Sequence, residues 1–133
     1  MKPVFADTFF FLASVNPADA AHRIASDWIG DYKGPLLTTA WVVTELADAF
    51  SASVNRGTFA ALYRAMHANP RLEIMPPDPD VFERALNLYF DRPDKHWSLT
   101  DCISFTVMTE RGLTDAVTGD HHFEQAGFKA LLR

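Results

Sequence analysis

Three aspartates stand at places in the 133-residue sequence where an open α/β fold gathers functional groups. Asp7 ends an apolar segment, Asp120 closely follows another, and Asp101 opens a segment with helical periodicity. Carboxylate oxygens are the ligands that hard divalent cations such as Mg²⁺ and Mn²⁺ prefer in proteins. The predicted chemistry is therefore that of a divalent-cation site, assembled from positions far apart in the chain.

Glu45 is the fourth acid of the predicted site, and it lies within an apolar helical face. At about 100° per residue it shares an arc with five apolar residues. They are Trp41, Val42, Leu46, Ala49 and Ala52. An unpaired carboxylate in such a face must be neutralised, pair with a cation or ligate a metal, because burying a bare charge is costly. A metal shared with the three aspartates would compensate its charge.

Each acid also has a structural interpretation, and these alternatives stay open. Asp7 can cap the turn that follows it, and Ser98–Asp101 has the spacing of a capping box. Thr118–Asp120 is compatible with a plain turn, and Glu45 can pair with an arginine or lysine. The metal interpretation is favoured because all four positions fit one cluster. No P-loop, GxGxxG, CxxC or Ser-His-Asp pattern offers a competing site.

Short apolar segments alternate with longer segments of helical periodicity. The predicted strands span Pro3–Asp7, Pro35–Thr39, Arg71–Met75, Asp115–Thr118 and Phe128–Leu132. The predicted helices span Ala18–Gly30, Trp41–Ser53, Thr58–Ala68, Asp78–Asp91, Thr100–Arg111 and His122–Gln125. Parallel strands need crossover helices that cover both faces of the sheet. The pattern predicts an α/β fold, a three-layer α/β/α sandwich around a mainly parallel, about five-stranded sheet.

Bulk composition sets limits on the class of protein. The length suits one domain spanning residues 1–133, and no segment reaches the ~20 apolar residues of a membrane span or forms a signal peptide. We therefore expect a cytoplasmic protein. The single cysteine, Cys102, predicts a buried thiol. The net charge of −5 argues against nucleic-acid binding through a broad basic surface, but bound cations would reverse the local field of an acidic site.

Four stretches carry a combined pattern: Val4–Thr8, Thr44–Leu46, Ser98–Cys102, and Ala116–Phe123 with Gly127–Phe128. Together they resemble the PIN-domain family, in particular its single-domain bacterial VapC-type toxins. The resemblance covers nearly the whole chain and gives Asp7, Glu45, Asp101 and Asp120 the order of that family's four acids. One position departs, because relatives usually carry a small polar residue after the first Asp-Thr pair, where this chain has Phe9.

The resemblance implies a Mg²⁺- or Mn²⁺-dependent endoribonuclease that hydrolyses RNA phosphodiester bonds. Asp7, Asp101 and Asp120 would coordinate one or two ions, and Glu45 would ligate directly or orient a coordinated water. The resemblance further implies the toxin of a type II toxin–antitoxin pair, commonly a homodimer inhibited by a cognate antitoxin protein. Two alternatives are an inactive PIN-like binding or regulatory module and a phosphatase-type hydrolase. The latter would need a second aspartate after Asp7, where the chain has Thr8-Phe9.

Residues beside the acids are candidates for supporting roles. The hydroxyls of Thr8, Thr100 and Thr118 can hydrogen-bond ligand carboxylates or act as caps. His121 and His122 can contact phosphate or lie in a surface loop.

Two further groups of residues have both a binding and a structural interpretation. The stretch Arg92–Trp97 mixes basic and aromatic groups, as a single-stranded RNA contact or an ordinary loop would. The apolar stripes Trp28–Ile29 and Phe59–Met66 fit the core, or a dimer or antitoxin surface.

Overall fold

The computed structural model describes residues 1–133 as a five-stranded parallel sheet with helices on both faces. The strands are β1 (Val4–Ala6), β2 (Leu36–Thr39), β3 (Leu72–Met75), β4 (Asp115–Val117) and β5 (Lys129–Ala130), in the order β3-β2-β1-β4-β5. Every neighbouring pair is parallel. The predicted fold class is confirmed, and the sheet is parallel throughout.

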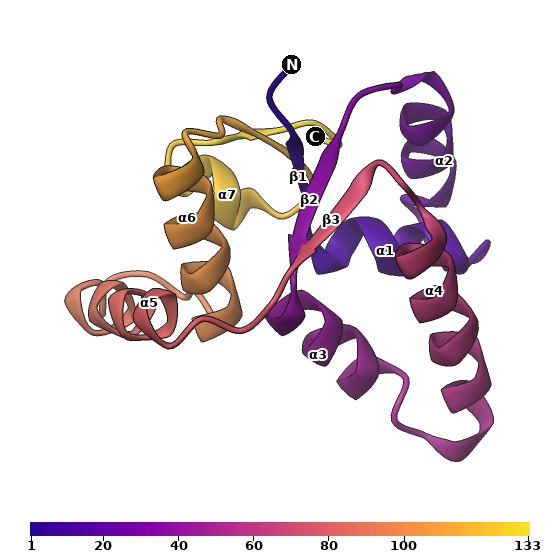
Figure 1. Cartoon of the computed structure of the whole chain (residues 1–133), viewed down its shortest axis with the longest axis horizontal. Coiled ribbons are helices and arrows are strands. Elements are labelled where there is room, and N and C mark those ends of the chain that lie inside the picture. Colours follow the sequence, from indigo (N-terminus) through magenta and orange to yellow (C-terminus); the bar gives the residue numbers. More distant parts are fainter.

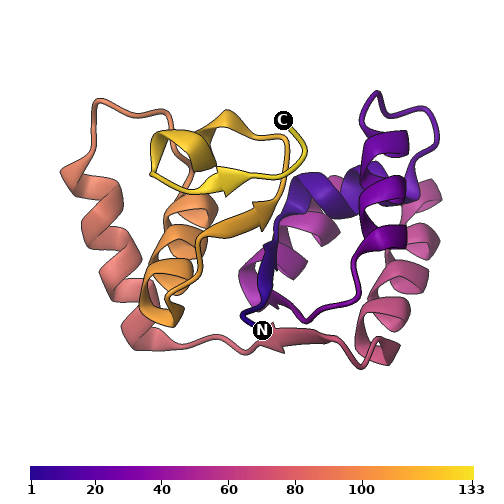
Figure 2. The same cartoon turned by 90° about the horizontal axis from the view of Figure 1, so that it is seen from above.

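Seven α-helices connect and cover these strands. They are α1 (Thr8–Val15), α2 (His22–Asp31), α3 (Ala40–Ala49), α4 (Arg56–Ala68), α5 (Pro79–Asp91), α6 (Leu99–Arg111) and α7 (His121–Gln125), with a 3-10 turn at Ser53–Asn55. In Figures 1 and 2, α5, α6 and α7 lie on one side of the sheet, and α1, α2 and α4 lie on the other. The helix α3 starts directly at the carboxyl end of β2. No helix of this fold could span a lipid bilayer.

The central strand β1 is buried along its whole length, and its side chains belong to the main apolar cluster. Phe5, in the middle of β1, packs near Phe123 of α7, which in turn meets Phe105 of α6 edge to face at 5.0 Å between ring centroids. Such aromatic contacts add to the stabilisation from buried apolar area. They fix against the sheet α6, which carries Asp101, and α7, which begins directly after Asp120.

Helix ends follow local sequence signals where those signals are strong. Asp78 caps α5 by accepting hydrogen bonds from the backbone N–H groups of Asp80 and Val81, and Pro79 occupies the first turn. The helix α6 ends at Gly112, whose φ of +67° lies in the left-handed region that favours glycine. Both boundaries fall within a residue of the predicted ones.

The helix α1 was not predicted, and its composition explains why. Phe10, Phe11 and Ala13 are all buried in it, and its apolar residues surround the axis without forming one stripe. A helix buried on most sides has no amphipathic period to detect. The predicted helix Ala18–Gly30 is shorter than expected and begins at His22, and the last strand covers only Lys129–Ala130.

Apolar stripes and the lone cysteine take core positions, as their simplest interpretation predicted. Trp28, Ile29, Phe59 and Leu62 are partly buried against the core, and Met66 is fully part of it. Cys102 is a buried free thiol, and burial raises its pKa to about 11. A thiol with such a pKa stays protonated at neutral pH, which fits a structural residue.

Candidate active site

The strands β1 and β4 are neighbours, but the chain leaves β1 toward β2 and β3 before returning to β4 on the other side. This reversal of direction is a topological switch point, where open α/β sheets bind their ligands beyond the carboxyl ends of the strands. Asp7 follows β1 directly, and Thr118 follows β4. The Thr118 hydroxyl donates a hydrogen bond to Oδ2 of Asp7 at 3.0 Å, across the switch point.

Asp7 is almost completely buried, with 4% of its surface exposed. Although it sits at the N-cap of α1, its side chain makes no capping hydrogen bond. Burial is the main reason that the pKa of Asp7 rises to about 7, and the charges of Asp101 and Glu45 raise it further. The Thr118 hydrogen bond opposes this shift. Asp7 is therefore a buried acid near other acids, and a cation beside it would stabilise its ionised form.

Glu45 lies half-buried in the second turn of α3, the helix that directly follows β2. Its Oε1 accepts a hydrogen bond from the hydroxyl of Thr8, the residue next to Asp7. No arginine or lysine pairs with it, so the ion-pair interpretation is wrong. The hydroxyl of Thr8 instead joins α3 to the start of α1 and brings Glu45 to the edge of the sheet where Asp7 lies.

Asp101 is the third residue of α6, and the predicted capping box is present. Its backbone N–H donates to the Ser98 hydroxyl at 3.0 Å, and its Oδ2 accepts from the Ser98 backbone N–H at 3.1 Å. Desolvation by burial raises the pKa of Asp101, and the charge of Asp120 adds to the rise. The capping role and the site role are therefore compatible, because the box fixes the carboxylate at the end of α6 that faces Asp120.

Asp120 follows β4 and caps α7. Its backbone N–H donates to the Thr118 hydroxyl at 3.0 Å, and its Oδ1 accepts from the His122 backbone N–H at 2.9 Å. The Nδ1 atom of His122 lies 3.0 Å from Oδ2 of Asp101 and 3.5 Å from Oδ1 of Asp120. A chain of contacts thus runs from Asp7 through Thr118, Asp120 and His122 to Asp101.

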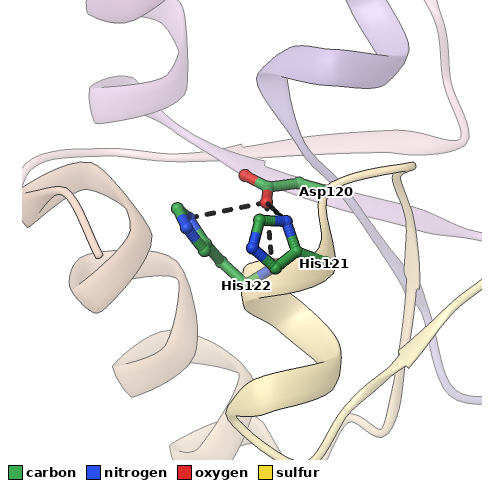
Figure 3. Close-up of side chains that lie close together, drawn as sticks. All are labelled: Asp120, His121 and His122. Atoms are coloured by element: carbon green, nitrogen blue, oxygen red, sulfur yellow. Dashed lines mark hydrogen bonds and ion pairs between the residues drawn. The ribbon is translucent and has the colours of Figure 1, made fainter. Parts of the chain in front are cut away.

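One compact group of potential ligand atoms lies in this network. The ligand atoms of Asp120, His121 and His122 lie within 4.8 Å of one another, and Figure 3 shows both imidazoles beside the Asp120 carboxylate. The expectation that both histidines lie in a surface loop is wrong, because both belong to α7; His121 is exposed there, whereas His122 is half-buried and in contact with Asp101. For the contact of His122 with Asp101, the only signal in the sequence was the position of His122 in a predicted helix, two residues after Asp120.

The arrangement of donors suits a hard cation. Asp101 and Asp120 each accept hydrogen bonds through one oxygen only, and so does Glu45. Their second oxygens have no donor within the chain, and Asp7 accepts a single side-chain hydrogen bond. Carboxylates held by one oxygen and open at the other are suited to coordinate Mg²⁺ or Mn²⁺. The residues therefore fit such an ion.

Other predicted neighbours divide into two groups. Thr8 and Thr118 hydrogen-bond predicted ligands, whereas the Thr100 hydroxyl makes no hydrogen bond to any acid. Trp97 is buried, and its Nε1 donates to Gln125, so its ring is not free to stack on a base. Arg92 lies over the Trp97 ring and pairs with Asp94.

The departure at Phe9 also has a structural counterpart. The ring of Phe9 lies over Gly119, where an added Cβ would come within 2.4 Å of the ring's Cζ. Glycine at this turn therefore makes room for the aromatic ring. Phe9 offers no hydroxyl or amide, and its ring instead forms an apolar surface beside the turn that contains Gly119 and Asp120.

A family model for the PIN domain matches residues 4–129, nearly the whole chain. The chain belongs to the PIN-domain family. Among other PIN proteins, the 23S rRNA-specific endonuclease VapC20 of Mycobacterium tuberculosis is 27% identical over 126 residues, which are 94% of this chain and 95% of the relative. This relationship makes the chain a PIN-domain nuclease of the VapC type, and the predicted family and enzyme class are confirmed.

Solved structures of PIN proteins share the fold. The crystal structure of Mycobacterium tuberculosis VapC20, described as a sarcin-ricin loop cleaving toxin, has a TM-score of 0.86 at 24% identity and covers 94% of this chain and 95% of that one. VapBC2 from Rickettsia felis, bound to a promoter DNA fragment, gives 0.69 at 13% identity, with 96% of both chains covered. DNA-bound VapBC from Salmonella typhimurium gives 0.68 at 15% identity, with 98% and 97% covered.

Proposed function

We propose that this PIN domain is a Mg²⁺- or Mn²⁺-dependent endoribonuclease whose cation is held by Asp7, Glu45, Asp101 and Asp120. The observation that carries the proposal is the network of hydrogen bonds that joins these acids at the switch point of the sheet. Asp7 supports the proposal most strongly. Its carboxylate is 4% exposed and has a pKa of about 7, and a bound cation would stabilise the negative charge that burial disfavours.

The chain's own groups prepare the site before any ion arrives. Thr118 orients Asp7, Thr8 orients Glu45, and the capping box orients Asp101. A bound divalent cation would lower the pKa of a coordinated water and neutralise charge on the scissile phosphate. Asp7, with a pKa of about 7, is about half protonated at neutral pH in the metal-free chain, and its ionised form would be the one that holds a cation. The four acids would otherwise repel the phosphate, so substrate binding depends on the cation.

RNA is the proposed substrate, and ribosomal RNA is the first candidate because the 27% identical relative is a 23S rRNA-specific endonuclease. The proposed biological setting is a toxin–antitoxin pair, since structures of the same fold include VapBC complexes. A small antitoxin protein would then inhibit the nuclease. We further propose a homodimer, which light scattering on the purified chain would test directly.

The test of the function uses purified, antitoxin-free protein with 23S rRNA and with unrelated RNA, in Mn²⁺, Mg²⁺ or chelator. The variants Asp7→Asn and Asp101→Asn remove one negative charge each and keep the side-chain shape. Asp31→Asn is the matched control. Asp31 is exposed at the end of α2 and precedes β2, so it lies toward the amino ends of the strands, away from the proposed site.

We expect metal-dependent cleavage that leaves 5′-phosphate ends, falls at least about 100-fold in both site variants and is unchanged in Asp31→Asn. Cleavage that persists in chelator, or in both site variants, would contradict the proposal. Stoichiometric Mn²⁺ binding without cleavage of any RNA would favour the inactive binding module.

A further inference from the structure

His122 is the imidazole that links two of the proposed ligand carboxylates. Its side chain is 19% exposed, and its Nδ1 lies 3.0 Å from Oδ2 of Asp101. Its own backbone N–H donates to Oδ1 of Asp120 at 2.9 Å. One residue therefore holds an acid from α6 and the acid that caps α7, and Figure 3 shows its ring directed toward the Asp120 carboxylate.

These contacts decide which carboxylate oxygens stay open. Oδ2 of Asp101 accepts from both His122 and the Ser98 backbone, which leaves Oδ1 without a donor. Oδ1 of Asp120 accepts from the His122 backbone, which leaves Oδ2 without a donor. A donor between two like-charged groups also reduces their repulsion. His122 is thus placed to fix both the spacing of the acids and the direction of their open oxygens.

We propose that His122 is a positioning residue of the nuclease site, holding Asp101 and Asp120 in the geometry that binds a divalent cation. The inference rests on the proposed function, since it concerns the same acids. It requires a proton on Nδ1, which the contact with the Asp101 carboxylate favours. Outer groups that orient metal ligands in this way typically contribute about 10- to 100-fold in metal affinity or activity.

His121 provides a neighbouring comparison. Its side chain is 57% exposed, and its Nδ1 lies 3.7 Å from Oδ1 of Asp120, without a hydrogen bond to any acid. The two histidines have the same ring and lie on the same acidic turn, but only His122 reaches a second element. Replacing each in turn separates positioning through Asp101 from a general effect of imidazole near Asp120.

The substitutions follow from the position of one nitrogen. In His122→Asn, the amide nitrogen is the same number of bonds from Cβ as Nδ1, so it can donate to Asp101. In His122→Phe, a planar aromatic ring is kept and the donor is lost. Circular dichroism and thermal unfolding of each variant establish that it is folded, so that changes in metal binding report on the site.

The experiment measures Mn²⁺ binding to the metal-free chain by calorimetry, and RNA cleavage as a function of Mn²⁺ concentration. We expect His122→Phe to weaken Mn²⁺ binding about 10- to 100-fold, with KM for RNA unchanged at saturating Mn²⁺. We expect His122→Asn to recover most of the affinity and His121→Phe to stay within about 3-fold of the native chain.

The outcomes separate this inference from the proposed function. Native Mn²⁺ affinity in His122→Phe overturns the positioning role, whether or not RNA is cut. Equal losses in His121→Phe and His122→Phe also overturn it and assign both imidazoles to the metal. If Mn²⁺ binds and depends on His122 but no RNA is cleaved, the positioning role stands and the nuclease proposal fails. If the native chain does not bind Mn²⁺, both fail.

Discussion

At the scale of single residues, the site depends on hydroxyls and one imidazole as much as on acids. The Thr118 hydroxyl donates a hydrogen bond to Asp7 and accepts one from the Asp120 backbone N–H. One hydroxyl therefore joins the segments that follow β1 and β4. Each such bond stabilises the fold by about 1 kcal/mol, but an orphaned buried carboxylate costs more. Asp7 is therefore the residue at which stability and function oppose each other.

The pH dependence of stability should show this opposition. The pKa of Asp7 rises from 3.8 to about 7 in the folded chain, so the folded state binds the proton more tightly than the unfolded state. In the metal-free protein, this group therefore makes the free energy of unfolding fall as pH rises from about 4 to about 7. Asp7→Asn has no charge to desolvate, so its free energy of unfolding at pH 8 should be about 2 to 4 kcal/mol higher than that of the native chain.

Urea unfolding in chelator at pH 4.5 and pH 8 measures this difference. Only the native-minus-variant difference is informative, since Asp101 has a raised pKa and Glu73 a lowered one. A difference that is the same at both pH values would show that Asp7 is not the buried acid that its geometry indicates.

The packing of Phe9 over Gly119 makes a second prediction at this scale. In Gly119→Ala, the new Cβ would lie 2.4 Å from Cζ of Phe9, so the ring must move. We expect a loss of about 1 to 3 kcal/mol in the free energy of unfolding. Phe9→Ala creates the missing space, so the double variant should be more stable than the sum of the single effects allows. Additive effects in a thermal double-mutant cycle would contradict this contact.

At the scale of elements, α6 brings stability and chemistry together. Its first turn carries the capping box with Asp101, and its buried face carries residues such as Cys102, Phe105 and Met108. Ser104 is the exception on this face, because its buried hydroxyl has no hydrogen-bond partner. A polar group buried without a partner destabilises the fold.

We therefore expect Ser104→Ala to keep or raise the free energy of unfolding, by up to about 1 kcal/mol. The matched control is Ser98→Ala, the same chemical change at a hydroxyl that accepts from the Asp101 backbone. That variant should lose about 1 kcal/mol and should also weaken Mn²⁺ binding, since the box orients Asp101. Chemical denaturation measures both variants. A clear loss in Ser104→Ala would mean that its hydroxyl has a partner in solution.

At the scale of the whole molecule, the sheet order places four distant segments at one edge. Asp7 and Asp120 follow the adjacent strands β1 and β4. Helix α3, which starts at the carboxyl end of β2, carries Glu45, and helix α6 carries Asp101. A cation shared by these segments would hold the two halves of the sheet together. Metal binding should therefore stabilise the fold as a unit.

Thermal and urea unfolding with and without Mn²⁺ test this coupling. At free Mn²⁺ of about 100 times its dissociation constant, the native chain should gain about 2.7 kcal/mol, and chelator should remove the gain. Asp101→Asn should gain much less, whereas the control Asp31→Asn should gain as much as the native chain. Equal gains in both variants would place the stabilising ion elsewhere.

Local patterns in the sequence predicted the strands and the amphipathic helices and singled out the four acids, because each leaves a signal over a few residues. Alternating apolar segments and capping residues such as Asp78 and Gly112 act over a few residues, and the observed boundaries agree with them. The order of the acids and the combined motifs were sufficient to indicate the family. What remains a proposal is the metal role of those acids.

The contacts that link the acids depend on the folded arrangement of distant segments. The helix α1 has no amphipathic period, since the sheet and the neighbouring helices α2 and α3 cover it. Thr118 meets Asp7 across 111 residues, and His122 meets Asp101 across 21. Contacts over such separations depend on strand order and helix packing, which no local pattern encodes. For this reason the sequence could name the acids and the Thr8 and Thr118 hydroxyls as candidates, but which acid each hydroxyl contacts, and the contact of His122 with Asp101, followed only from the fold.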